Sequence, residues 1–123
     1  DRTKERRWHT AIPLFVGGAF LGLAIAMQNH LLPAFLAMIV VGACTTAFMP
    51  SFWALPTAIL SESAAAASIG FINSVGNLGG FTGPFAIGYL STLTHSFAPG
   101  LAVVLIAMIL SGAIVLRLRI HRT

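Results

Sequence analysis

Charged side chains are scarce in this sequence, and the stretch between Trp8 and Leu116 contains no lysine or arginine. Charged residues make up 8% of the 123 residues and hydrophobic residues 57%, whereas about a quarter of an average soluble domain is charged. The net charge is +4, and the seven basic residues stand at the two ends: Arg2, Lys4, Arg6, Arg7, Arg117, Arg119 and Arg122. This distribution excludes an ordinary soluble domain. It is typical of a membrane protein and not of a nucleic-acid-binding surface, so we expect no nucleic-acid partner.

Cysteine is nearly absent as well. Cys44 stands alone in an apolar run, so no disulfide can form within the chain. The four histidines lie near the ends or in predicted turns, without the spacing of metal ligands. No combination of serine or cysteine with histidine and an acid suggests catalysis. We therefore expect no enzymatic activity, no cofactor and no metal.

Four apolar stretches separated by short polar turns predict an all-α integral membrane protein with four transmembrane helices. A helix rises about 1.5 Å per residue, so about 20 residues cross a hydrocarbon layer of about 30 Å. The second stretch is too long for one straight crossing, and its two prolines predict a bend. Ser63 is predicted to cap the third helix. The expected spans are approximately residues 10–28, 32–59 with kinks at Pro50 and Pro56, 64–91 and 99–116.

The basic ends predict the orientation in the membrane. Lysine and arginine are enriched in cytoplasmic segments, and the polar turns at 28–30 and 92–98 contain neither residue. An even number of spans places both termini on one side of the bilayer, which is then the cytoplasmic side. We expect a multi-pass protein of the cell's inner or plasma membrane. Because the first residue is Asp1 and not methionine, we also expect a fragment of a larger protein.

The third stretch is unlike the others, because it combines many glycines with two amides and a proline. Gly76 and Gly80 have the four-residue spacing that lets another helix approach closely in lipid, and Pro84 predicts a kink. Asn73 and Asn77 share one face of the helix. Their amides either form a hydrogen bond between helices or line a wet cavity, where they can donate to a carboxylate or hydroxyl ligand.

Trp53 stands between two prolines in the second stretch. A tryptophan near a membrane boundary is often an interfacial anchor. This residue lies about twenty residues into its span, where the flat indole and its single donor also suit the wall of a cavity. The sequence alone leaves both interpretations open.

One long segment resembles a known family. FWALPTAILSESAAAASIGFINSVGNLGGFTGPFAIGYL, residues 52–90, looks like the tenth and eleventh helices of major facilitator superfamily transporters, in particular the anion:cation symporters that include tartrate and other carboxylate permeases. The opening DRTKERR is similar to the second half of the superfamily's cytoplasmic loop motif, with Lys4 in place of the usual glycine. The resemblance covers essentially the whole chain. It implies that the four spans are helices nine to twelve, the C-terminal part of the C-terminal helix bundle of a twelve-helix fold.

The resemblance also implies roles for particular residues. Trp53 and Asn73 match positions that face the central substrate cavity, and Asn77 shares the face of Asn73. Asp1 and Arg2 match the loop motif that gates the cytoplasmic side. The other residues that we expect to act in conformational change are Pro50, Pro56, Gly76, Gly80 and Pro84.

The implied function is secondary active transport of a small organic anion, such as a hydroxy acid or a sugar acid, by proton symport with alternating access. The expected partners are the small organic anion, protons, the lipid bilayer and a missing N-terminal transporter half. We expect this piece alone to be inactive.

Two alternatives remain open. The first is a small four-helix, proton-coupled drug exporter. Such an exporter needs a carboxylate inside the membrane, whereas Asp1, Glu5 and Glu62 all lie outside the middle of the predicted spans. The second is a membrane interaction module without transport activity, or a truncated gene product, in which the glycines form a docking face.

Overall fold

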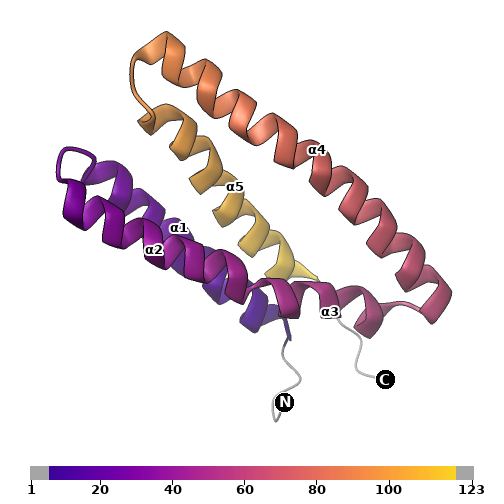
Figure 1. Ribbon diagram of the computed structural model, residues 1–123. Helices are drawn as coiled ribbons and strands as arrows, with labels where there is room; N and C mark the ends of the chain where they lie inside the picture. The colour runs from indigo at the N-terminus through magenta and orange to yellow at the C-terminus, as the bar shows by residue number, and fades with distance from the viewer. Residues whose placement is uncertain (1–5, 119–123) are drawn as a thin grey trace.

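The computed structural model describes residues 6–118, and these residues form helices joined by short turns (Figure 1). The helices are α1 (Arg6–Ala26), α2 (Leu31–Ala47), α3 (Met49–Ile59), α4 (Glu62–Thr94) and α5 (Ala98–Arg117). No strand occurs within this part of the chain. The predicted fold class, an all-α membrane protein, is confirmed.

Three segments are long and apolar enough to cross a membrane: Arg7–Ala26, Leu31–Ala58 and Ala98–Arg117. The second of them joins α2 and α3 into one bent span. α4 is longer than any of the three, with 33 residues, but its glycines and asparagines lower its apolar character. That α4 provides the fourth crossing stays a prediction.

The core lies between α1, α2 and α5. Its buried residues are Leu14, Leu21, Val41 and Met108. The glycines of α1 allow this close packing, since a Cβ atom at Gly17 would lie only 2.7 Å from Met108 Cε and 3.1 Å from Cys44 Cβ. A helix pair in lipid is held mainly by such close van der Waals contact. These three helices therefore form the tightly packed part of the molecule.

α4 leans away from this core and is attached to it near its two ends (Figure 1). Ala65 is buried near the turn that joins α3 to α4. At the other end, Gly100 of α5 packs directly on Ile87, whose Cα would lie 2.8 Å from a Cβ at position 100. The predicted cap of this helix is wrong in detail: α4 already begins at Glu62, and the N-cap is Ser61, not Ser63.

The outer ends of α1 and α5 meet at one end of the helix bundle. Arg7 Nη1 donates a hydrogen bond of 2.8 Å to the carbonyl oxygen of Leu118, just after α5 ends. Carbonyl groups at the end of a helix have no partner inside the helix, and a basic side chain nearby satisfies one of them. The start of α1 and the end of α5 therefore lie at the same end of the bundle.

Candidate substrate-binding site

Trp53 is positioned by an interruption between α2 and α3. Pro50 has no backbone N–H, so the carbonyl oxygen of Thr46 loses its usual helical partner. α2 ends one residue later, at Ala47, and Phe48 separates the two helices. The bend predicted near Pro50 therefore lies at Phe48. α3 continues through Pro56, and the N–H of Leu60 donates to the Pro56 carbonyl over 3.0 Å.

Aromatic rings continue from this interruption to Trp53. The Phe48 and Phe52 rings meet edge to face, with centroids 5.9 Å apart and an interplanar angle of 66°. Phe52 and Trp53 make a second edge contact at 5.3 Å and 71°. Trp53 itself is partly buried. Its indole is therefore held on one side by protein and retains an accessible side.

Asn73 and Asn77 both lie on the exposed surface of α4. Neither amide makes a hydrogen bond to another side chain or backbone group within residues 6–118. The hydrogen bond between helices that the sequence allowed is thus not formed in the described part of the chain. The amides are free to bind water, a ligand or a further helix, and Asn73 and Asn77 share one face because they are four residues apart.

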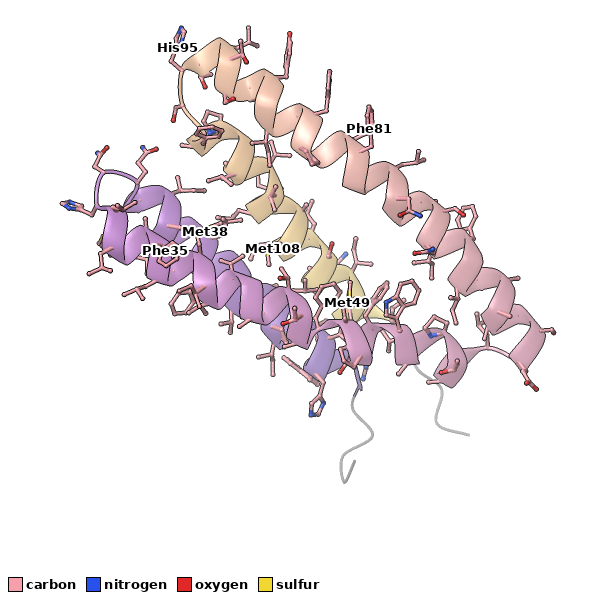
Figure 2. All side chains as sticks on the ribbon, viewed as in Figure 1. Phe35, Met38, Met49, Phe81, His95 and Met108 are labelled. Carbon is pink, nitrogen blue, oxygen red and sulfur yellow. The ribbon has the colours of Figure 1, made fainter. Side chains whose placement is uncertain are left out.

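The middle of α4 has two contrasting faces. At 100° per residue, one face carries bulky side chains and the opposite face carries the two amides with the glycines. Phe81 points away from the other helices (Figure 2). It stacks on Phe85 at 6.4 Å, and Phe85 stacks on Tyr89 at the same distance. The bulky residues of this face are Phe71, Val75, Leu78, Phe81, Phe85, Tyr89 and Leu93.

Gly76 and Gly80 of α4 are not in close contact with another helix in this structure. A Cβ atom at Gly76 or Gly80 would meet no atom within 4 Å. The close contacts belong instead to α1 and α5, which sequence reasoning did not single out. The signal was present, because Gly18 and Gly22 also have the four-residue spacing of helix-packing glycines.

The structure does not place the predicted ligand-binding residues in one described pocket. A cavity of about 340 Å³ opens at the turn between α3 and α4. It is lined by Thr57, Leu60, Glu62, Ala65, Ala66 and Ile69, so it contains neither Trp53 nor an asparagine. Asp1 and Arg2, the predicted gating residues, lie outside the described residues. Within residues 6–118 no group of three or more histidine, cysteine or acidic residues could hold a metal ion.

Three relatives show what kind of protein this chain is similar to. A protein of Agrobacterium vitis named for tartrate transport is 39% identical over 116 residues, which is 94% of this chain and 26% of that protein. The inner membrane transport protein RhmT of Escherichia coli is 36% identical over all of this chain and 28% of its own length. A quinolone resistance transporter of Acinetobacter baumannii is 38% identical over 89% of this chain and 25% of its own length.

The chain is therefore similar to part of several named membrane transporters. The chain spans about a quarter of the length of the relatives that it matches. No family model matches the sequence, and no solved structure matches it significantly. The chain is therefore a transmembrane segment related to transporters.

Proposed function

We propose that these residues are helices nine to twelve of a transporter that moves a small organic anion together with protons. The observation that carries the proposal is the 39% identity to a tartrate-transport protein along 94% of the chain. A relative with the same kind of name aligns over a similar length at 40% identity. The substrate is a small carboxylate, such as a hydroxy acid or a sugar acid, and transport follows an alternating-access cycle between two helix bundles.

In this proposal Trp53 and the α4 amides form part of the wall of the substrate cavity. The partly buried indole offers an apolar face and one N–H donor. Asn73 donates its amide hydrogens to a substrate oxygen, and Asn77 does so from the same face of the helix. Both amides have this capacity available, because neither is bound to another group in residues 6–118.

The remaining predicted residues are proposed to act in the conformational change of the transport cycle. Pro50 and Pro56 shape the bent second span, and Gly76, Gly80 and Pro84 let α4 bend. Asp1 and Arg2 act at the cytoplasmic entrance. Both termini lie in the cytoplasm, in keeping with their basic residues, and the protein resides in the inner membrane. The N-terminal half and the other helices of the C-terminal half lie outside these 123 residues.

A chimera tests the proposal directly. The segment of the Agrobacterium vitis relative that matches this chain is replaced by residues 1–123, and uptake of radiolabelled tartrate is measured in proteoliposomes with an inward proton gradient. We expect uptake that a protonophore abolishes. Trp53→Ala in the chimera is expected to abolish uptake, whereas Trp8→Ala, at an exposed position near the membrane boundary, serves as the matched control. A correctly assembled chimera that moves no carboxylate would reject the proposal.

Residues 1–123 alone are expected to transport nothing. Alternating access requires two helix bundles that move against each other, and this chain supplies only part of one. Uptake of an organic acid by liposomes that contain this chain alone would contradict that expectation.

Drug export is the second candidate function, because a quinolone resistance transporter aligns with 89% of the chain at 38% identity. The two candidates differ in the direction of transport and in the class of solute. A chimera built on that relative is expected to leave cells sensitive to quinolones if the carboxylate proposal holds. Restored quinolone resistance without carboxylate uptake would favour drug export.

A further inference from the structure

Trp53 has one described aromatic neighbour, Phe52. The two rings meet at 5.3 Å and 71°, an edge contact within the range of favourable aromatic pairs. The indole makes no hydrogen bond within residues 6–118. Neighbouring residues of a helix diverge by about 100°, so Phe52 flanks the indole and does not cover it. Phe52 is therefore the aromatic ring that lies against Trp53 in the described residues.

Phe52 is itself held by a contact with Phe48, the residue that lies between α2 and α3. Its ring meets Phe48 at 5.9 Å, and the N–H of Phe52 donates to the Phe48 carbonyl over 2.9 Å. Phe48 in turn packs against the core cluster, which includes Leu14 and Met108. A continuous set of ring contacts thus runs from the core through Phe48 and Phe52 to Trp53.

This arrangement matters because the backbone is weakened at the same place. Pro50 removes one helical hydrogen bond, so side-chain contacts must supply part of the restraint on how α3 is oriented relative to α2. The ring of Phe52 contacts Phe48, the residue between the two helices, and also touches the indole directly.

We propose that Phe52 is a positioning residue, which holds the Trp53 indole in the orientation that the substrate cavity requires. The expected effect of Phe52 on transport rests on the proposed function, in which Trp53 lines the substrate cavity. The physical part of the proposal, that Phe52 fixes the indole, is independent of any substrate. The two parts are therefore tested by separate measurements.

The first measurement uses fluorescence of the chain in lipid vesicles. The sequence has two tryptophans, so Trp8→Phe leaves Trp53 as the single emitter. In this background Phe52→Leu is expected to lower the fluorescence anisotropy of Trp53 and shift its emission to the red, because the indole gains mobility and exposure. Phe52→Tyr keeps a ring and is expected to preserve both signals. Phe35→Leu is the matched control, because Phe35 is exposed on α2.

Far-UV circular dichroism identifies variants that lose helical structure, and Phe52→Tyr keeps the test decisive if Phe52→Leu fails to fold. Unchanged anisotropy in a folded Phe52→Leu variant would overturn the proposal. So would a loss of anisotropy in Phe52→Tyr equal to that in Phe52→Leu.

The second measurement uses tartrate uptake by the chimera. Loss of an aromatic edge contact corresponds to a rise in KM of about two- to tenfold in Phe52→Leu, with a smaller change in kcat and with recovery in Phe52→Tyr. If Trp53→Phe leaves KM unchanged while Phe52→Leu still lowers the anisotropy, Phe52 positions the indole and the proposed substrate role of Trp53 is wrong. If both variants raise KM, the positioning role extends to binding.

Discussion

Replacing glycine by alanine is expected to have opposite effects at Gly100 and at Gly80. At position 100 the new Cβ would lie 2.8 Å from Ile87 Cα and 3.1 Å from Ile87 Cβ. The nearest atom belongs to the backbone of α4, so no rotation of a side chain relieves the clash. The two helices have to move apart where Gly100 of α5 packs on Ile87 of α4.

The expected cost of Gly100→Ala is about 1–3 kcal/mol, the usual penalty for overfilling a packed site. Gly80→Ala introduces the same methyl group where no atom lies within 4 Å. It is expected to stabilise the chain by about 0.5–1 kcal/mol, because alanine loses less conformational entropy than glycine in a helix. The two variants thus add the same methyl group but are expected to change the stability of the chain in opposite directions.

Unfolding of the chain in mixed micelles by increasing SDS, followed by far-UV circular dichroism, measures the difference. Gly22→Ala is a useful third variant, since its Cβ would meet only the end of the Leu105 side chain at 3.2 Å, and we expect a small effect. The reasoning fails if Gly100→Ala is as stable as the parent chain. It also fails if Gly80→Ala is the less stable of the pair.

Three further predictions concern a ligand contact, a turn and a helix end. In the chimera, Asn73→Ala is expected to raise KM for tartrate about three- to tenfold through loss of one hydrogen bond. Ser74→Ala is the control and is expected to have no effect, because the Ser74 hydroxyl donates to the Gly70 carbonyl of its own helix. Equal KM values for the two variants would refute the role of Asn73 in substrate binding. His95→Gly is expected to raise stability in SDS titration by about 1 kcal/mol, because His95 has a left-handed φ of 53° that glycine adopts without strain; a loss of stability would contradict this. Arg7→Gln is expected to lower stability by about 0.5–1 kcal/mol by removing the bond to the α5 end, and no change would show that water replaces it.

The sequence predicted local structure well where prolines and polar turns determine it. Pro50 predicted an interruption in the second span, and the structure has it two residues earlier, at Phe48, within the turn whose hydrogen bond Pro50 removes. The start of α4 was misjudged by one or two residues, because Ser61 and Ser63 are equally good capping residues and neither forms a side-chain cap here.

Packing between helices was predicted less well. The glycines of the third stretch drew attention through their number, but the glycine that packs on Met108 and Cys44 is Gly17. Spacing identifies a surface on which a helix can approach closely, but it does not say which neighbour is present. The same limit on sequence-based prediction applies to the residues of the candidate site. The family resemblance implied that Trp53 and Asn73 face one cavity, and this stays a prediction because the described pocket contains neither.

The expected bending residues of α4 lie between its two attachment points. Ala65 is buried at one end and Ile87 packs on Gly100 at the other, and Gly76, Gly80 and Pro84 all lie between them. Pro84 cannot donate to the carbonyl four residues earlier, which is that of Gly80, so the weakest backbone hydrogen bonding coincides with a residue that has no side chain to resist bending. α4 can therefore bend there without breaking either contact, which is what the proposed alternating-access cycle would require of it.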